Sequence, residues 1–257
     1  MVNVNAFVTL LTSDSYIQGV VALAHSLHIT HTKNELVCMV TKSVSQDIIE
    51  SLEKPGDLYD KVILVDELDS KDQKNLELLG RPELGITFTK LNVWKLVQYN
   101  FVTFLDADTI VLKNIDSLFD QIKEVYNNGD VAFLAAPDVG WPDNFNSGVF
   151  VCKPDLQTYS DLINYSRTNG SYDGGDQGLL NRFFSKWNNT LNARLSFNYN
   201  VTPSAYYTYA PSFNEHQDSI SVIHFIGNNK PWKSILKLII MKMNIRMMIH
   251  LKLSQVI

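Results

Sequence analysis

The alternation of short apolar runs with segments of helical periodicity constrains the fold of this chain more than any other feature. In the first half, apolar runs of strand length occupy residues 6–11, 35–40, 61–66 and 101–108, and helix-period segments occupy 15–28, 45–52 and 89–99. The run at 101–108 is almost continuously apolar, which is typical of a strand covered on both faces. This βαβ order predicts an α/β chain with a mainly parallel, doubly wound, Rossmann-like sheet. Ligands of such sheets bind beyond the carboxyl ends of the strands.

The second half of the chain is less regular. We predict strands at residues 131–137, 147–152 and 221–227, and helices at 155–168 and 176–187. In the helix predicted at 89–99, Leu91, Trp94 and Val97 should face inward. Because there is no internal repeat and no low-complexity linker, we expect one domain over residues 1–232.

Charge is distributed unevenly along the chain. The net charge is −5, but residues 233–257 hold five basic side chains and no acid, so residues 1–232 carry 17 basic and 27 acidic ones. An acidic body argues against a nucleic-acid surface, which needs clustered Lys and Arg.

The N-terminus has no basic segment before its first strand, so we expect no signal peptide and a cytoplasmic protein. We predict that residues 233–257 form a disordered tail, and they lack the uncharged stretch that a membrane span requires.

Asp106 and Asp108 form the sharpest local motif. Side chains two residues apart on an extended chain point the same way, so both carboxylates should project from the end of a buried strand. Their repulsion would raise one pKa strongly, and a divalent cation with oxygen ligands would relieve it. A solvated turn is the alternative, since Asp-x-Asp is common by chance. His224 would add a nitrogen ligand that suits Mn²⁺ better than Mg²⁺, although a lone strand histidine is more often a core residue.

Two further places combine turns with polar side chains. Gly227 and Lys230 follow the last predicted strand, where a lysine could bring one cation to a diphosphate or simply be exposed. Asn146 and Ser147 stand at the start of another strand. Such clusters at a sheet edge hydrogen-bond sugars, but they also form ordinary turns.

A helix start and a tyrosine cluster complete the candidates. Asp173, Asp176 and Gln177 lie in one turn with two glycines that let the backbone approach a ligand, and Asp176 fits the N-cap. Three tyrosines fall within residues 206–209. Aromatic density of this kind usually belongs to a core or an interface.

Seven segments, in order between residues 6 and 232, resemble the glycogenins, a self-glucosylating group within glycosyltransferase family eight. They are AFVTLLTSDSY, GRPELGITFTKLNVWKL, FLDADTIVLKNIDSLFD, APDVGWPDNFNSGVFVCKP, SYDGGDQGLLNRFF, FNYNVTPSAYYTYAPSF and IHFIGNNKPW. The resemblance implies a single-domain nucleotide-sugar transferase fold. It also implies a retaining enzyme that transfers glucose from UDP-glucose to its own tyrosine and extends an α-1,4-glucan primer for glycogen synthesis.

The resemblance assigns roles to individual residues. The Mn²⁺ ligands, with Mg²⁺ as an alternative ion, would be Asp106, Asp108 and His224. The donor nucleotide would contact Leu10, Thr12, Ser13, Tyr16, Arg81, Lys90, Ala107, Gly227 and Lys230. The glucose would be held by Asp138, Asn146, Ser147, Asp173, Asp176 and Gln177. In the reaction, Lys230 would stabilise the departing UDP, Asp176 would face the developing positive charge of the sugar, and Tyr207 would be the self-glucosylated acceptor.

The chain departs from the family pattern at two places. Ser13 replaces the usual Asn, and residues 233–257 resemble nothing in the family; they are either translated non-coding sequence or a basic amphipathic segment. The family's segment that docks glycogen synthase is not recognisable, which puts that partner in doubt, whereas a homodimer and binding of the chain's own glucan are expected. Two rival readings stay open: a galactinol-synthase-like hexosyltransferase of the same family, and a catalytically silent carbohydrate-binding scaffold.

Overall fold

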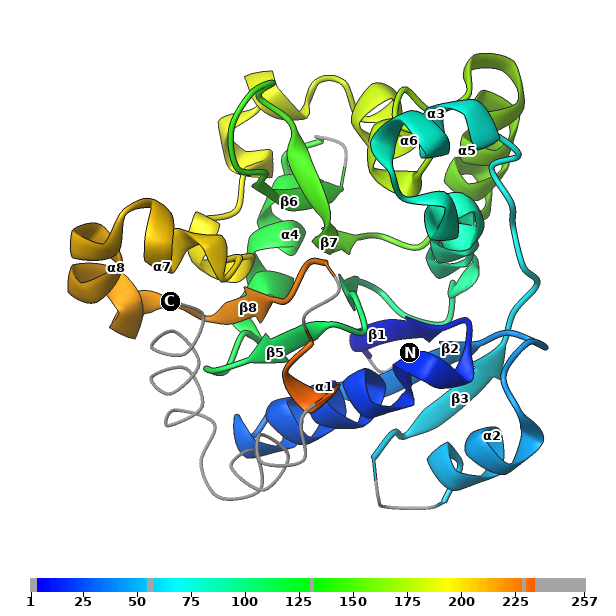
Figure 1. Ribbon diagram of the computed structural model, residues 1–257, viewed down its shortest axis with the longest axis horizontal. Coiled ribbons are helices and arrows are strands. Elements are labelled where there is room, and N and C mark those ends of the chain that lie inside the picture. The colour runs from blue at the N-terminus through cyan, green and yellow to red at the C-terminus, as the bar shows by residue number, and fades with distance from the viewer. Residues whose placement is uncertain (1–3, 55–57, 130–131, 228–229, 234–257) are drawn as a thin grey trace.

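A six-stranded sheet forms the centre of the molecule (Figure 1). The structure, a computed structural model, describes residues 4–54, 58–129, 132–227 and 230–233. The strand order is β3-β2-β1-β4-β7-β6, and β7 alone runs against the other five. The strands are β1 (Ala6–Leu11), β2 (Glu35–Val40), β3 (Lys61–Leu64), β4 (Val102–Leu105), β6 (Phe133–Pro137) and β7 (Phe145–Cys152). The predicted mainly parallel α/β sheet is therefore confirmed.

Helices of very different length surround this sheet. The α-helices are α1 (Ile17–Ile29), α2 (Gln46–Leu52), α3 (Gln73–Leu79), α4 (Ser117–Asn127), α5 (Leu156–Asn169), α6 (Asp176–Phe183), α7 (Ser204–Thr208) and α8 (Ala210–His216). The 3₁₀ segments are Asp14–Tyr16, Pro82–Lys95, Trp187–Asn189, Leu191–Ala193, Phe197–Tyr199, Gln217–Ser219 and Pro231–Lys233. Among the described residues, no helix has the length and apolar character needed to cross a bilayer.

The parallel half of the sheet determines where a ligand can bind. In the register, Ala6 of β1 pairs with both Glu35 of β2 and Val102 of β4, so the carboxyl ends of these strands lie at one edge. The chain order reverses between β1 and β4, because β1 continues into β2 on one side while β4 lies on the other. A reversal of this kind opens a crevice at the carboxyl ends of the two strands. The turn after β4 carries the Asp106–Asp108 motif to this edge.

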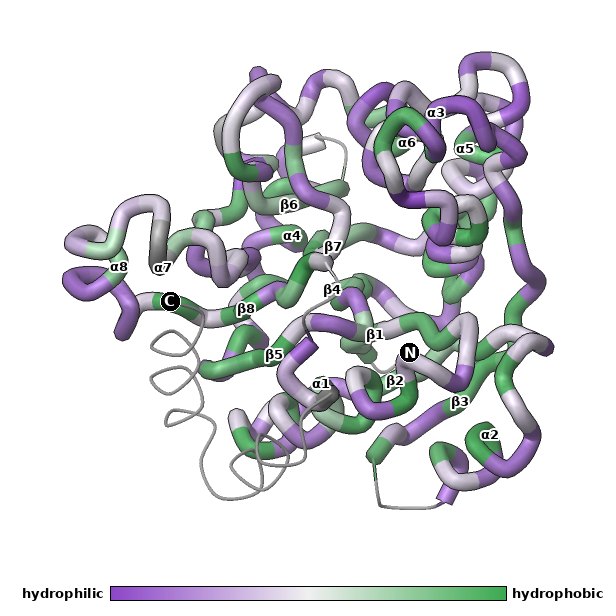
Figure 2. Tube along the Cα trace, viewed as in Figure 1, coloured by the Kyte–Doolittle hydropathy of each residue, from purple (hydrophilic) through white to green (hydrophobic). Residues whose placement is uncertain are grey.

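Burial of the central strands explains why their sequences are so apolar. Residues of β4 and β7 are buried along their whole length, and hydrophobic colour gathers on the strands (Figure 2). On one face, Phe7 of β1 meets Phe119 of α4 edge to face at 5.1 Å. Trp94 stacks on Phe150 of β7, with 5.5 Å between the ring centroids. One continuous core thus holds the sheet against the segments that cover it.

A second, two-stranded sheet lies outside the main one. It pairs β5 (Thr109–Val111) with β8 (Val222–His224), and Thr109 faces His224 in the antiparallel register. The strand predicted at 221–227 is therefore shorter than expected and belongs to this small sheet. Ile110 and Ile223 of this sheet pack into a separate cluster that includes Trp232, whereas Val111 and Val222 belong to the main core. This pairing brings His224 beside the end of β4, although His224 lies 119 positions after Leu105 in the sequence.

Among the other predicted elements, three differ most from the observed ones. The segment predicted as a helix at 89–99 is a 3₁₀ segment, Pro82–Lys95; Leu91 and Trp94 are buried as expected, but Val97 is exposed. Tertiary bonds decide its shape, because Thr89 Oγ1 accepts from the backbone of Leu68. The strand at 101–108 ends at Leu105, and the helix at 176–187 ends at Phe183.

Candidate active site

The Asp-x-Asp motif lies on a turn rather than on a strand. The backbone N–H of Asp106 donates to Gly148 O at 2.8 Å, and the N–H of Thr109 donates back to Asp106 O at 3.0 Å. The prediction that an extended chain aligns the two carboxylates was therefore wrong in its geometry. The turn nevertheless directs the carboxylates of Asp106 and Asp108 toward the same partner, His224.

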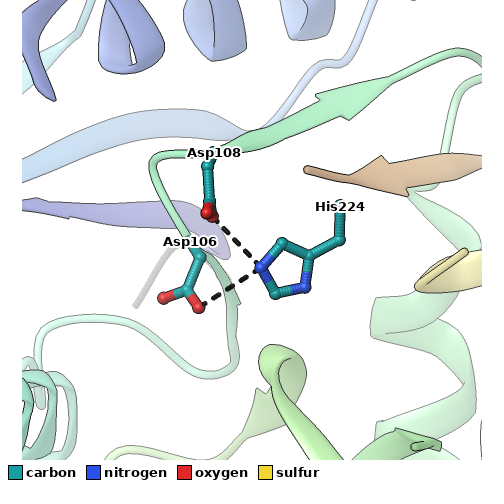
Figure 3. A group of neighbouring side chains, drawn as sticks. All are labelled: Asp106, Asp108 and His224. Carbon is teal, nitrogen blue, oxygen red and sulfur yellow. Dashed lines mark ion pairs between the residues drawn. The ribbon is translucent and has the colours of Figure 1, made fainter. Parts of the chain in front are cut away.

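Asp106, Asp108 and His224 form a compact acid–imidazole cluster (Figure 3). Nε2 of His224 lies 3.1 Å from Oδ1 of Asp108 and 3.8 Å from Oδ2 of Asp106. One ligand atom from each of the three residues lies within 4.8 Å of the others. Two carboxylates and one imidazole make an oxygen and nitrogen donor set that first-row divalent metals accept. The predicted residues thus form a candidate metal site.

Two buried lysines compensate the carboxylates. Nζ of Lys90 lies 3.0 Å from Asp106 and 2.6 Å from Asp176, and it donates to Ser147 O at 3.1 Å. Nζ of Lys230 pairs with Oδ2 of Asp108 at 2.5 Å. Lys90 is only 3% exposed, so a solvent-shielded ammonium group joins Asp106 to Asp176.

The pKa values follow from this arrangement. Burial disfavours the charge of Lys90, but the carboxylates of Asp106 and Asp176 outweigh it and raise the pKa of the ammonium group. Burial raises the pKa of Asp106, and the neighbouring Asp108 acts in the same direction. Burial also opposes ionisation of Asp108, yet His224 and Lys230 hold the pKa of this carboxyl well below its usual range. The contacts with His224 and Lys230 therefore favour the carboxylate form of Asp108.

Amide groups line the side of the site formed by β7 and α6. Nε2 of Gln177 donates to Oδ2 of Asp138 at 2.7 Å, while its Oε1 accepts from the backbone N–H of Ser147 at 3.2 Å. Oδ1 of Asn146 accepts from the backbone N–H of Gly148 at 2.9 Å. These bonds connect the strand, the helix and the loop after β6, so the structure brings together the residues predicted to hold a sugar.

The N-cap residue of helix α6 is Gly175, and the carboxylate of Asp173, not that of Asp176, accepts from the backbone at the start of this helix. Oδ1 of Asp173 accepts from the backbone N–H groups of Gly175 and Gly178 at 2.9 and 3.1 Å, and from Ser171 Oγ at 2.7 Å. The N-cap prediction for Asp176 is corrected, since this residue is the first of the helix and its carboxylate turns to Lys90. Burial raises the pKa of Asp173, while the bonds from Ser171 and the backbone oppose the rise.

The residues predicted to contact a nucleoside surround the carboxyl end of β1. Tyr16 lies beside the acid cluster, and its ring is 5.9 Å from Nζ of Lys230. Burial raises the pKa of the Tyr16 phenol, with the charge of Asp108 as a further cause and Arg81 in opposition. At Gly19 of α1, a Cβ would lie 2.3 Å from the carbonyl oxygen of Ala107, so only glycine permits this approach. The other three residues, Leu10, Thr12 and Ser13, are half-buried at the same strand end.

The tyrosine cluster lies on α7 and the residues that follow it. The backbone of Tyr207 belongs to this helix, whereas its side chain lies outside the described part of the structure. Tyr209 is 68% exposed and lines a cavity of about 250 Å³, together with Phe197, Val201 and other residues.

Gly227, in the predicted diphosphate turn, has a φ of +87°, which glycine adopts without strain.

Sequence reasoning missed three residues of this site. Asn200 is buried, and its Oδ1 lies 3.0 Å from Nδ1 of His224. Gly148 holds the backbone of Asp106, and Thr87 Oγ1 accepts from the N–H of Asp176 at 3.1 Å. A single sequence gives no signal for them, because each acts through a partner at least 24 positions away, in another element of the fold.

Solved structures share this architecture at low sequence identity. The chain is similar to the glycosyltransferase GlyE of Streptococcus pneumoniae TIGR4, with a TM-score of 0.64, 18% identity, and coverage of 98% of this chain and 64% of that one. It is also similar to the galactosyltransferase LgtC, with a TM-score of 0.58, 18% identity, and coverage of 88% and 89%. At this identity the comparison establishes the fold alone.

Sequence comparisons give a closer relationship. The chain is 47% identical over 228 residues to glycogenin-1 of Homo sapiens, covering 88% of this chain and 62% of that protein. It is 46% identical to glycogenin-1 of Caenorhabditis elegans, covering 88% and 50%. The chain thus spans about half to two thirds of the length of these relatives. The model of glycosyl transferase family 8 matches residues 7–236, and the chain therefore belongs to this family.

Proposed function

We propose that this chain is a glycogenin-like, retaining glucosyltransferase that transfers glucose from UDP-glucose to its own Tyr207 and extends an α-1,4-glucan primer. The similarity to glycogenins over 88% of the chain supports this activity. The acid–imidazole cluster carries the proposal, because its three ligand atoms lie within 4.8 Å of one another at the carboxyl ends of the strands. Such a cluster beside two buried lysines suits an anionic nucleotide sugar.

Mn²⁺ fits the residues of the cluster. Asp106, Asp108 and His224 would hold it through two carboxylates and Nε2. When bound, the ion supplies Lewis-acid neutralisation of the diphosphate. Lys230, buried next to Asp108, supplies a further fixed positive charge for the departing UDP. Around the nucleotide, Tyr16 provides an aromatic face at the end of β1.

The sugar would lie over the amide-lined side of the site. Asp138, Asn146, Ser147 and Gln177 present hydrogen-bonding groups there, and Asp173 orders the start of α6. Asp176 contributes the carboxylate that faces the developing positive charge of the sugar, while Lys90 holds this carboxylate in place at 2.6 Å. The same ammonium group orients Asp106, so the positions of the sugar and the diphosphate are linked.

Tyr207 requires positioning rather than acidity to react. A phenol with a pKa of about 10 is a poor nucleophile at neutral pH, so its oxygen must be held close to the anomeric carbon. We expect Tyr207→Phe to block attachment of the first glucose and to spare transfer to an added maltoside. Mixing this variant with a donor-site variant such as Asp176→Asn would restore labelling if one subunit of a homodimer glucosylates the other. Hexose on Tyr206 or Tyr209 in the unmodified protein, with Tyr207 bare, would contradict the assignment.

The organisation of the chain is part of the proposal. We infer a catalytic domain over residues 1–232, because all proposed site residues fall within it. From the similarity to glycogenins we further propose that it acts in the cytoplasm. The tail predicted at 233–257 lies, from residue 234 onward, outside the described residues. Truncation after Trp232 should leave the transferase activity nearly unchanged, and loss of activity or solubility would show that the tail packs against the body.

Intact-mass spectrometry tests the proposed function directly. The purified protein is incubated with Mn²⁺ and either UDP-glucose or UDP-galactose, and a ladder of hexose additions is expected with UDP-glucose. Transfer from UDP-galactose to a free polyol, without a ladder, would instead support a galactinol-synthase-like enzyme. Absence of any turnover of either donor would support a non-catalytic carbohydrate-binding scaffold.

A further inference from the structure

A chain of hydrogen bonds leads from the backbone of β7 to the imidazole of His224. It begins at Gly148, whose N–H donates to Oδ1 of Asn146 at 2.9 Å. The same Oδ1 accepts from Nδ2 of Asn200 at 2.9 Å. Oδ1 of Asn200 then lies 3.0 Å from Nδ1 of His224. These four groups form what we call the Asn146–Asn200 relay.

The direction of each bond in the relay follows from its first member. A backbone N–H can only donate, so the atom of Asn146 that faces Gly148 must be the carbonyl oxygen. Asn200 must then present its NH₂ group to this oxygen, which leaves its own carbonyl oxygen toward the ring. An amide oxygen can only accept, and Nδ1 of His224 must therefore carry a proton. Nε2, the nitrogen that faces the two carboxylates, is therefore the one whose lone pair is available when the ring is neutral.

Burial makes this orientation hard to change. Asn200, His224 and Asn146 are 3%, 4% and 8% exposed, so water cannot readily replace any bond of the relay. A backbone bond also fixes the last residue of the relay, because the N–H of His224 donates to Val201 O at 2.9 Å. At Gly148 a Cβ would lie 2.1 Å from Cε1 of His224, so the ring fills the space that the missing side chain leaves.

Gly148 thereby controls both halves of the acid–imidazole cluster. Its carbonyl oxygen accepts from the N–H of Asp106, and its N–H begins the relay that ends at His224. A lone pair on Nε2, 3.1 Å from a carboxylate oxygen, is electrostatically unfavourable unless a proton or a metal cation lies between them. The relay therefore prepares the ring to bind a cation and withholds the proton that Nε2 would otherwise carry in the other neutral tautomer.

We propose that Asn200 is a positioning residue that fixes His224 with its proton on Nδ1, so that Nε2 is presented as a ligand to the divalent cation. This inference rests on the proposed metal site and adds to it a residue beyond the ligands. Partners that orient a ligating histidine in this way commonly contribute about 10–100-fold to metal affinity. Asn200 acts only through His224 and Asn146 and need not touch the substrate.

The experiment compares Asn200→Ala, Asn200→Asp and an exposed control, Asn192→Ala, in the full chain. Free Mn²⁺ is measured by electron paramagnetic resonance during titration of each protein. Asn200→Ala should weaken Mn²⁺ binding by about 10–100-fold, and Asn192→Ala should leave it unchanged. Asn200→Asp keeps an acceptor facing Nδ1, so it should retain more affinity than Asn200→Ala. If the role of Asn200 were purely structural, Asn200→Asp should bind Mn²⁺ more weakly than Asn200→Ala, because the aspartate adds a buried charge.

A second readout examines the ring without metal. In ¹⁵N-histidine spectra at pH 9, with His224→Gln used for assignment, His224 should show the Nδ1–H tautomer in the unmodified protein and lose it in Asn200→Ala. Equal Mn²⁺ affinity in the unmodified protein and Asn200→Ala, or an Nε2–H tautomer in the unmodified protein, would overturn the inference. An Nδ1–H tautomer in a protein that binds no Mn²⁺ would uphold the positioning and contradict the proposed function.

Discussion

The charged and amide sides of the site hold their polar groups in different ways. On the charged side, Lys90 and Lys230 lie within 3.0 Å of carboxylates that would otherwise repel one another. On the amide side, the uncharged side chains of Gln177 and Asn146 accept hydrogen bonds from the backbone N–H groups of Ser147 and Gly148. Both sides meet at β7, where Ser147 accepts from Lys90 and donates to Gln177.

This difference determines how each side responds to substitution. A buried ion that loses its partner remains as an uncompensated charge, whereas an amide that loses one bond retains its others. The charged side should therefore tolerate substitution least. It is also the side where a bound cation would change the charge balance most, since the acids now face Lys90, Lys230 and the imidazole of His224.

Substitution of Lys90 should have the largest effect. Lys90→Met leaves Asp106 and Asp176 close together without their shared cation, and it should lower the free energy of unfolding by about 3–5 kcal/mol. Urea unfolding measures this loss. Lys95→Met, in the same 3₁₀ segment but exposed, is the matched control and should change the value by less than about 0.5 kcal/mol. Equal effects of the two substitutions would contradict the role of Lys90.

Substitution of Asp108 should reduce activity rather than stability. Asp108→Asn keeps the size of the side chain but removes the charge that faces His224 and Lys230. We expect Mn²⁺-dependent UDP-glucose hydrolysis to fall by about 100-fold or more. The exposed Asp218→Asn is the control, and unchanged hydrolysis in Asp108→Asn would remove this residue from the metal site.

On the amide side, Gly178 and Gly175 provide a sharp comparison. A Cβ at Gly178 would lie 2.3 Å from Oδ1 of Asp173 and 2.4 Å from Oγ of Ser171, whereas the nearest atom at Gly175 is 3.6 Å away. Gly178→Ala should therefore displace the Asp173 carboxylate and cost about 1–3 kcal/mol of stability. Gly175→Ala should be tolerated. Thermal and urea unfolding of both variants check this order.

The smallest effect is expected at the cap of α6. Asp173→Ala removes the acceptor for two backbone N–H groups, which should cost about 0.5–2 kcal/mol. Asp173→Asn keeps an oxygen acceptor and should cost less. If both variants unfold like the unmodified protein, Asp173 does not cap the helix, and its carboxylate is available for other contacts.

Local patterns predicted the parallel half of the fold because its strands are buried on both faces and read as apolar runs. β1 and β2 have the predicted bounds, and Asp106 and Asp108 were recognised from their position after such a run. The conformation of their turn was not predictable, because it depends on the bond to Gly148 in another strand. Val97 was wrongly placed in the core, because the segment before it is a 3₁₀ helix bonded to Leu68 and not the predicted α-helix.

The roles of single polar side chains were harder to predict than the elements that carry them. Asp173 and Asp176 are three residues apart, and only the fold decides that one caps the helix while the other pairs with Lys90. Asn200 carries no local signal, since its function depends on Asn146 and His224, which β7 and β8 supply. Hydrogen-bond networks of this kind can be recognised only from the three-dimensional structure.

Binding of UDP with and without Mn²⁺ tests the central claim most directly. If the acid–imidazole cluster holds a cation that meets the diphosphate, calorimetric titration should give an affinity for UDP at least about tenfold higher in Mn²⁺ than in EDTA, which corresponds to about 1.4 kcal/mol. In Asp108→Asn this difference should largely disappear. Equal affinity for UDP in Mn²⁺ and in EDTA for the unmodified protein would contradict the account.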